Sequence, residues 1–429
     1  MLKKDSSLLN WVWFFGTALA VVFISVPHLG FFGIGRNLFI DEVVNIDAAV
    51  SFFQRGWITN RSSTKAFDEW ISSGLLTSVF PALGTLVSGS YKWGRLISVF
   101  QNALALSSVA WLLSFLTRER ATQLAFLGLV LLIPALPASL IYSQGEFLSF
   151  TCLVWGLYFY SVRKRFWVSS LFFALAVHFK LIAIVDIAGG LFLLGVFQAK
   201  DARNLKWVRP YFVNSLKAVA GIPLLFAVSQ LYQFLWLSSV QEYLDTARAF
   251  TGFFFSAGSG LNAPTSVSRW QKLTALSEFG AYQWRSKLIF VLISLIPIAA
   301  LWKSKNQKLK QNDPIFLFVL GLAGASIFHL LWWYFKSDQI WIRHGFIGLF
   351  VACACGALVL PLEKFRRYLP QLRIVMLLIC VGIVLMKFRS GYKEFYGRPI
   401  GCEADVMQFQ FCDAKNPSLE FHPYRFDSK

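Results

Sequence analysis

Eight ionisable residues lie within or beside long apolar segments, where a lipid bilayer makes a charge expensive. They are Asp41, Glu42, Glu146, Lys180, Asp186, His329, Arg343 and His344. Charged groups in membrane segments usually pair with one another or line a water-filled path, and they often mark a functional site. When the apolar segments are threaded through a membrane in turn, all eight residues fall at one face. The sequence therefore predicts an active site where carboxylates and cations meet at that face.

Asp41 and Glu42 follow the first apolar segment by only a few positions. Neighbouring residues of a helix point about 100° apart, so we expect the two carboxylates to have different parts. A carboxylate in a partly desolvated site gains basicity and can take a proton from a hydroxyl group. The alternative is structural, because acids are also favoured in the first turn of a helix, here the one that holds Ala48 to Phe53.

Lys180 stands in the apolar stretch ALAVHFKLIAIVDIAGG. An ionised lysine at this depth costs about 3 kcal/mol, so it needs a partner or a wet path. One interpretation is a cation that holds the phosphate of a lipid-linked substrate. The alternatives are an ion pair with Asp186 or a side chain that reaches up to the membrane interface. His178, two residues away, faces another side of the helix, where we expect a core or interface role.

Arg343 and His344 precede a late apolar segment, at the expected N-terminal end of its helix. A helix N-terminus favours an anion, and a guanidinium can bind two phosphate oxygens with parallel hydrogen bonds. Anchoring to lipid headgroups is the alternative for this pair. Glu146 and His329 are also consistent with polar groups that are satisfied inside the protein.

The composition is that of an integral membrane protein. Of 429 residues, 56% are hydrophobic and 15% are charged, against about 25% charged in soluble domains. The mean hydropathy is +0.56, and apolar stretches repeatedly reach the ~20 residues that cross a bilayer. The net charge of +19 lies in short Lys and Arg clusters between these stretches. Membrane topology explains such clusters better than a nucleic-acid-binding face does.

We predict an all-α polytopic protein with about eleven transmembrane helices and further helices in its outer loops. The first is a retained span, because its apolar core is too long for a signal peptide. The expected spans are 11–34, 95–116, 121–141, 147–162, 166–182, 186–198, 211–239, 286–302, 314–335, 345–361 and 372–388.

The basic clusters place the N-terminus in the cytoplasm and the C-terminal tail outside. The outer loops are then 36–94 and 240–285, within a transmembrane module of residues 1–362. Residues 363–429 hold the last span and a short outer tail. The interval 166–198 is short for two spans, so we expect two short helices with Lys180 and Asp186 at their turn.

The six cysteines divide into two groups. Two of them, Cys402 and Cys412, lie in the polar tail, where a disulfide is an open alternative. The others are expected to be core residues of spans: Cys152, Cys353, Cys355 and Cys380.

The signatures of several function classes are absent from the sequence. It has no GxxxxGK[ST] loop, no GxGxxG turn between strand and helix, and no HExxH or CxxC pair. These absences disfavour an ATP-driven pump and a zinc protease. We expect no resident cofactor and assign no metal ligand, although the sequence leaves a divalent ion open.

The acidic pair belongs to a longer pattern, F-x-D-E-x-x-x-x-x-A, soon after the first span. Similar short motifs follow along the chain: the Gly145-Glu146 start of a span, Lys180 late in an apolar stretch after an RKR turn, and Arg343-His344. In order and membrane side, these motifs resemble the membrane glycosyltransferases of the GT-C fold. The likeness is to the protein mannosyltransferase and aminoarabinose transferase branch, and it covers residues 1 to about 362.

The resemblance implies a transferase that moves a hexosyl or pentosyl group from a polyprenyl-phosphate carrier to an acceptor at the outer face. Asp41 would be the general base and Glu42 its supporting acid. The residues that would bind substrate and phosphate are Lys180, Arg343, His344 and Glu146. The setting implied is a bacterial inner membrane and cell-envelope glycan biosynthesis, with no nucleic acid partner. The sequence shows no extended C-terminal soluble domain of the larger members, so the acceptor stays open among glycan, lipid and protein.

Two other functions remain open on the sequence. One is a flippase or transporter of lipid-linked sugars or other anions, which would also gather cations around a cavity, although transporters often show duplicated halves. The other is a non-catalytic membrane partner of another enzyme. The Gly- and Ser-rich segment 252–271 is either a mobile flap over the site or a surface loop.

Overall fold

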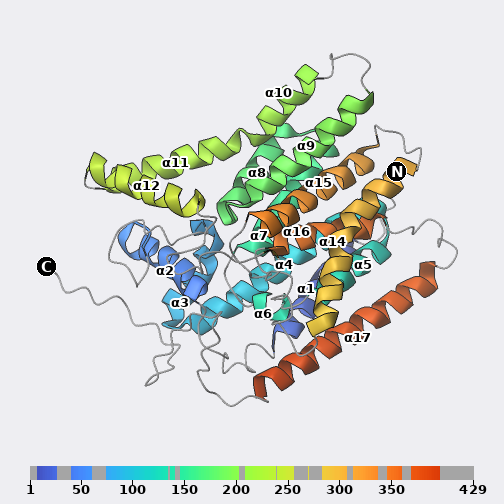
Figure 1. Ribbon diagram of the computed structural model, residues 1–429. Helices are drawn as coiled ribbons and strands as arrows, with labels where there is room; N and C mark the ends of the chain where they lie inside the picture. The colour runs from blue at the N-terminus through green and yellow to red at the C-terminus, as the bar shows by residue number, and fades with distance from the viewer. Residues whose placement is uncertain are drawn as a thin grey trace.

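The computed structural model of this chain is a bundle of helices (Figure 1). It describes residues 7–26, 40–59, 74–133, 136–140, 145–201, 208–237, 239–255, 269, 283–306, 313–336, 345–359 and 369–396.

In chain order, the helices are α1 (Ser7–Ser25), α2 (Ile40–Arg55), the 3-10 turn η2 (Leu75–Thr77), α3 (Val79–Ser88), α4 (Tyr91–Thr117), α5 (Arg120–Leu132), α6 (Leu136–Leu140), α7 (Glu146–Ser161), α8 (Phe166–Phe179), α9 (Ala183–Asp201), α10 (Val208–Val219), α11 (Gly221–Trp236), α12 (Val240–Phe255), α14 (Gln283–Asn306), α15 (Pro314–Phe335), α16 (Phe346–Val359) and α17 (Leu369–Tyr396).

Every expected span overlaps one or two of these helices. Three described helical segments are long and apolar enough to cross a bilayer by themselves: Trp93–Thr117 of α4, Val208–Trp236, which is α10 continued by α11, and Pro314–Phe335, which is α15. Seven of the other eight expected spans each overlap a shorter apolar helix of 10–17 residues, and the eighth, 147–162, corresponds to α7. The chain is thus a polytopic helical membrane protein, while the number of about eleven crossings stays a prediction.

Two expected spans are each divided into two helices. The span 121–141 becomes α5 and α6, because Pro134 follows α5 and a proline cannot continue a helix. The span 211–239 becomes α10 and α11, which join at Ala220 with the backbone still helical, so that Val208–Trp236 remains one continuous stretch. At this second division the backbone N–H of Gly221 donates to the Ser170 hydroxyl oxygen of α8 at 2.6 Å. The predicted short pair in 166–198 is present as α8 and α9.

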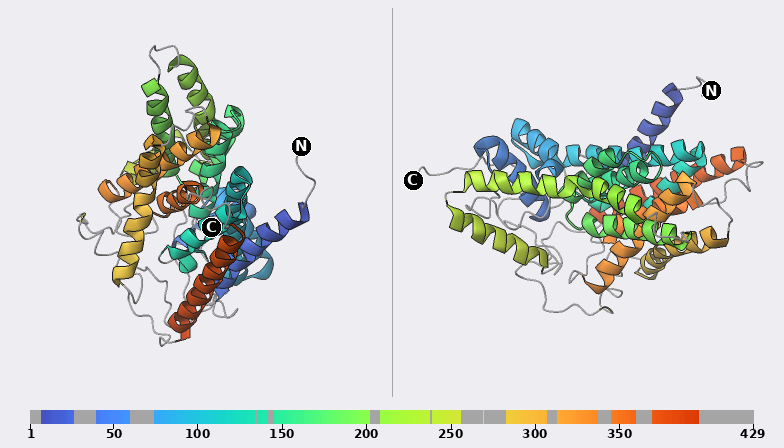
Figure 2. Two further views of the ribbon diagram at one scale, coloured as in Figure 1. Left: turned by 90° about the vertical axis from the view of Figure 1, so that its right-hand side faces the viewer. Right: turned by 90° about the horizontal axis from the view of Figure 1, so that it is seen from above.

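The helices α2, α3 and α12 lie together at one end of the bundle. Figure 1 shows them at the left, and the view from above in Figure 2 shows the same grouping. We call this end the outer end, after the sidedness that the sequence predicts. The opposite end, with the turns from α4 to α5 and from α7 to α8, is called the inner end.

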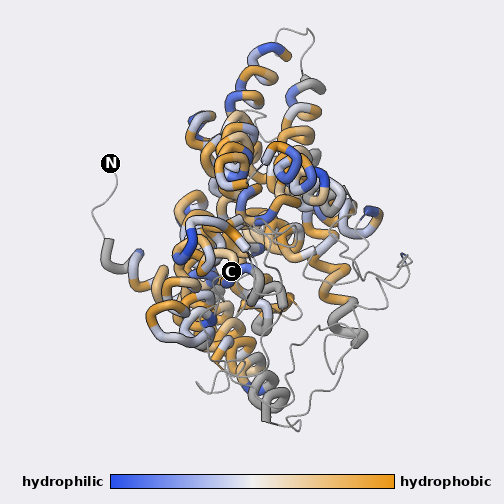
Figure 3. The backbone as a smooth tube through the Cα atoms, turned by 90° about the vertical axis from the view of Figure 1, so that its left-hand side faces the viewer, coloured by the Kyte–Doolittle hydropathy of each residue, from blue (hydrophilic) through white to orange (hydrophobic). Residues whose placement is uncertain are grey.

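The core of the bundle surrounds α16, in which every residue from Phe346 to Ala357 is buried. A helix that is apolar on all sides belongs in the interior of a bundle. By contrast, no residue of α11 is buried. Hydrophobic residues predominate along the helices (Figure 3), so helices with little burial present an apolar surface to lipid.

The pair α9 and α15 makes the most extensive helix contact within the described parts of the chain. Glycines allow it: a Cβ built on Gly324 would lie 2.4 Å from the Gly189 carbonyl oxygen. A Cβ on Gly190 would lie 2.9 Å from the Gly321 carbonyl oxygen. Small residues let two helix backbones approach closely in a membrane. The two helices are therefore held at a separation that no larger residue permits at these positions.

The four cysteines expected in spans, Cys152, Cys353, Cys355 and Cys380, are free and buried, as predicted. Cys402 and Cys412 lie outside the described residues, so their pairing stays a prediction.

Candidate functional site

The predicted acidic pair lies in the first turn of α2, which begins at Ile40. The expected helix that holds Ala48 to Phe53 is therefore present, and it continues to Arg55. The side chains of Asp41 and Glu42 lie outside the described part of the structure. Their roles as base and supporting acid therefore stay predictions, and so does the capping alternative.

The helix α2 is enclosed on all sides in its middle part. Every residue from Asn45 to Ser51 is buried. Its apolar residues pack with Ala82 of α3 and Tyr91 of α4. A helix buried around its circumference has little freedom to rotate, so the direction in which its first turn faces is fixed by packing.

The far end of α2 is held by aromatic residues of α11. The Tyr232 hydroxyl donates to the Gly56 carbonyl oxygen. A Cβ on Gly56, which has a φ of +80°, would lie 2.7 Å from the Trp236 ring, and Trp57 packs edge-on against that ring. Gly56 is thus required both by its left-handed backbone and by the close approach of Trp236.

A buried polar stripe runs along one face of α4 beside α2. Tyr91 donates from its hydroxyl to the Asp47 carboxylate of α2, and both side chains are buried. Arg95 and Asn102 follow on the same face, also buried. The Asn102 amide donates to the Leu140 carbonyl oxygen at 2.9 Å. A buried carboxylate and a buried guanidinium thus lie within two turns of the outer start of α4.

Glu146 and Lys180 form an ion pair at the outer ends of α7 and α8. The Lys180 Nζ lies 3.0 Å from the Glu146 Oε1, and the side chains are 14% and 6% exposed. Glu146 begins α7, and Lys180 directly follows α8. The close approach depends on Gly145, with a φ of +83°, because a Cβ there would lie 2.2 Å from the Phe179 carbonyl oxygen.

One of the alternatives for Lys180, an ion pair with Asp186, is wrong. Asp186, six residues further on, pairs with His329, and Lys180 turns to Glu146. The two residues face different neighbours. Lys180 directly follows α8, whereas Asp186 lies in the first turn of α9, which packs mainly on α15. The ion pair with Glu146 does satisfy the expectation that a lysine at this depth is paired.

Asp186 and His329 form a second contact, closed off from solvent. The His329 Nδ1 lies 2.7 Å from the Asp186 Oδ1, and both side chains are 0% exposed. The second carboxylate oxygen, Oδ2, has no hydrogen-bond partner among the residues that the structure describes. The pair lies one helical turn from Gly190 and Ala325 along the close contact of α9 with α15. The expectation that His329 is a satisfied internal polar group thus fits the structure.

His178 connects α8 to the first outer segment, a role the sequence left unspecified. Its carbonyl oxygen accepts from the Gly74 N–H at 2.7 Å. Its ring Nε2 accepts from the Leu76 N–H at 3.2 Å. The same turn η2 also contacts α2. The turn η2 therefore bridges the helix of the acidic pair and the helix end that precedes Lys180.

Arg343 and His344 lie outside the described residues. The helix α16 begins at Phe346, two positions after His344. The first turn of α16 packs on α15: a Cβ on Gly348 would lie 2.9 Å from the His329 ring. The Ser326 hydroxyl also donates to the Gly348 carbonyl oxygen at 2.8 Å. The start of the helix that follows Arg343 and His344 is thus seated beside the Asp186–His329 pair.

No group of three or more His, Cys, Asp or Glu side chains that could hold a metal ion occurs among the residues described. The segment 252–271 is described only at 252–255, the end of α12, and at Arg269, so its role as flap or surface loop stays untested.

Neither the protein-family models nor the curated protein sequences contain a match to this sequence. The structure, however, matches the crystal structure of ArnT from Cupriavidus metallidurans bound to undecaprenyl phosphate. The TM-score is 0.51 with 14% sequence identity, and the match covers 91% of this chain and 75% of that chain. The chain shares the GT-C fold of ArnT. This confirms, at the level of the fold, the resemblance that the short sequence motifs predicted.

Asp47 and Arg95 are buried polar residues of this region that were not among the candidates predicted from the sequence. The signal available was the spacing of Tyr91, Arg95 and Asn102, which places the three on one helix face. It was lost because the expected span began only at residue 95. In the structure α4 begins at Tyr91, which adds this residue to the face of Arg95 and Asn102, and all three side chains are buried.

Proposed function

We propose that this chain is a glycosyltransferase that takes a sugar from a polyprenyl-phosphate carrier and transfers it to an acceptor at the outer end of the bundle. The observation that carries the proposal is the fold shared over 91% of the chain with ArnT, a protein solved with undecaprenyl phosphate. Supporting it, polar groups are buried at the outer end at a cost that proteins in a membrane rarely bear without function.

In the proposed reaction, the Asp41 carboxylate takes the proton of an acceptor hydroxyl group. The hydroxyl oxygen then attacks the anomeric carbon, and the bond from that carbon to the phosphate oxygen breaks. The electron pair leaves with the polyprenyl phosphate, which gains one negative charge. Glu42 orients the base or the acceptor.

The charge on the departing phosphate is stabilised by cations, so no nucleotide-binding metal site is needed for this step. Arg343 and His344 contribute at the N-terminal side of α16, where the helix dipole also favours an anion. Lys180 contributes from the end of α8. Glu146 keeps the lysine in place in the absence of donor, since the two groups are 3.0 Å apart.

We place the reaction on the outer face of a bacterial inner membrane, with the N-terminus in the cytoplasm, in cell-envelope glycan biosynthesis. The acceptor is a hydroxyl-bearing glycan, lipid or protein. The fold likeness supports a lipid-carrier donor in general.

The test uses the purified chain in lipid nanodiscs with a radiolabelled polyprenyl-phosphate sugar and a mixture of envelope acceptors. We expect release of free polyprenyl phosphate together with labelled product. The Asp41→Asn variant should lower the rate by about 10²- to 10⁴-fold, the range for loss of a general base.

The matched control is Asp245→Asn, which removes an exposed carboxylate of α12 at the same end of the bundle. It should keep the full rate. Full activity of Asp41→Asn would remove the proposed base. Movement of intact donor across sealed vesicles, with no product, would instead favour the flippase.

A further inference from the structure

A small pocket opens at the inner end of the bundle, where α7 ends and α8 begins, at the opposite ends of these helices from the Glu146–Lys180 pair. It has a volume of about 340 Å³ and is lined by Lys164 and Arg165 of the turn between α7 and α8, by Phe166, Trp167 and Val168 at the start of α8, and by Lys217 of α10. Three of the six lining residues are cations, and none is an acid. We call it the inner pocket.

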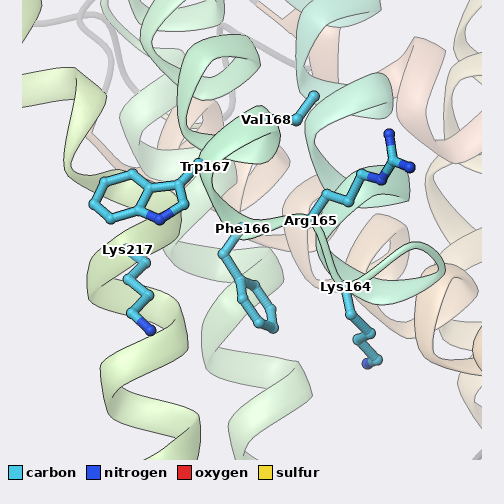
Figure 4. Close-up of a pocket in the computed structure, with 6 residues that line it drawn as sticks. All are labelled: Lys164, Arg165, Phe166, Trp167, Val168 and Lys217. Atoms are coloured by element: carbon cyan, nitrogen blue, oxygen red, sulfur yellow. The ribbon is translucent and has the colours of Figure 1, made fainter.

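The cations are arranged around an aromatic ring. Figure 4 shows the Phe166 ring between Lys164 and Lys217, whose ammonium groups extend to the same side as the ring. Trp167 lies above Lys217, and Arg165 points the opposite way. Lys164 of the turn and Lys217 of α10 therefore bracket one apolar surface, with Arg165 adding charge nearby.

The walls of the inner pocket are fixed by hydrogen bonds. Tyr160 and Ser215 are bonded through their hydroxyls at 2.9 Å, which ties α7 to α10. The Arg165 N–H donates to the Phe159 carbonyl oxygen at 2.9 Å, closing the turn. Within this turn Lys164 has a φ of +52°, a left-handed conformation in which glycine is the usual residue. A charged side chain thus occupies a strained position at the mouth of the inner pocket.

Positive charge in the inner pocket is not offset by the residues that line it. Lys164 is exposed, yet the side chains around it partly desolvate it and lower its pKa from the ordinary value. A negative group placed beside this lysine would offset that loss of hydration. The first N–H groups of α8, from Phe166 onward, also point toward this end of the helix, where an anion is favoured.

The surface next to the inner pocket is apolar. Trp167 is 68% exposed, and Leu171 follows on the same face of α8, also exposed. Leu224 of α11 is exposed about two helical turns beyond Lys217. Exposed tryptophans are typical of the membrane interface, with exposed leucines deeper in the hydrocarbon. A molecule that satisfies all of these groups has an anionic head and an apolar tail.

We propose that the inner pocket binds the phosphate headgroup of an anionic phospholipid from the leaflet at the inner end, with its acyl chains along Leu171 and Leu224. Basic pockets between transmembrane helices are suited to such headgroups. The site is separate from the proposed sugar transfer, and it does not depend on that function.

The test titrates the full-length protein in detergent with phosphatidylglycerol or phosphatidylcholine and counts bound lipid by native mass spectrometry. We expect the wild-type protein to prefer phosphatidylglycerol. The double variant Lys164→Gln/Lys217→Gln should weaken phosphatidylglycerol binding by about 30-fold, taking a contribution of ~1 kcal/mol for each lysine. Inorganic phosphate alone should not displace the lipid.

Two further variants make the test specific. The control Arg118→Gln/Arg209→Gln removes two exposed cations at the same end of the bundle and should leave the preference unchanged. The variant Lys164→Arg/Lys217→Arg keeps the charges and should retain binding. Equal affinity of the wild-type protein for both lipids would overturn the proposal. So would crosslinks of a photoreactive phosphatidylglycerol that fall outside residues 164–168 and the helix α10.

Discussion

Removing Lys180 separates its structural role from a role in binding phosphate. The Lys180→Met variant leaves the Glu146 carboxylate, 6% exposed, without its partner 3.0 Å away. Losing one member of a buried ion pair typically costs about 3–5 kcal/mol. Because the Lys180 side chain is 14% exposed, we expect a loss near the lower limit, about 3 kcal/mol.

The double variant Lys180→Met/Glu146→Gln removes both charges, so most of this loss should be regained. Unfolding in mixed detergent micelles, followed by tryptophan fluorescence, measures both variants and the single Glu146→Gln. The same proteins are then tested for binding of polyprenyl phosphate by isothermal titration.

The two roles predict different results for the double variant. If Lys180 holds phosphate, the double variant regains stability but binds polyprenyl phosphate at least tenfold more weakly than the wild-type protein. If the lysine only pairs with Glu146, stability and binding return together. A single Lys180→Met variant as stable as the wild-type protein would refute the reasoning from the buried pair itself.

Three more perturbations test the packing around the site. Gly324→Ala puts a Cβ 2.4 Å from a backbone oxygen of α9 and should destabilise the folded protein by about 1–3 kcal/mol. The control Gly382→Ala, with open space around it, should leave the stability unchanged. Equal melting temperatures of the two variants would contradict this prediction. His329→Leu leaves the buried Asp186 carboxylate without its partner and should lower the free energy of unfolding by about 3–5 kcal/mol. Adding Asp186→Leu should restore most of that loss, and chemical unfolding measures both variants. His178→Phe removes the acceptor of one η2 N–H and should speed amide hydrogen exchange at residues 74–77, while unchanged exchange would show that η2 is held otherwise.

The order of helices could be predicted from the sequence because the length and hydropathy of a span are local properties. The turn between α8 and α9 was predicted from the length and flanking charges of 166–198. A helix beginning at the Asp41-Glu42 pair was one alternative, based on the preference of acids for a first turn. The points at which an expected span is divided into two helices were harder to predict. The break between α10 and α11 involves a hydrogen bond from Gly221 to Ser170, 51 residues away, which hydropathy does not report.

The pairing of the polar residues could not be predicted, because it depends on which helices are neighbours. Lys180 is six residues from Asp186 but 34 from Glu146, and it pairs with Glu146. The contact of Asp186 with His329 spans 143 residues. Nearness in sequence favoured the wrong carboxylate, since each helix turns its polar residue toward the helix that packs on it.

The helix that begins with Asp41 and Glu42 ends at a contact with α11, where Tyr232 and Trp236 hold Gly56. None of α11 is buried, so its tilt responds to the thickness of the surrounding hydrocarbon. A thicker or thinner bilayer would therefore pull on α2 through its C-terminal end. The rate of the proposed sugar transfer should then depend on acyl-chain length, even when headgroup and donor are kept the same.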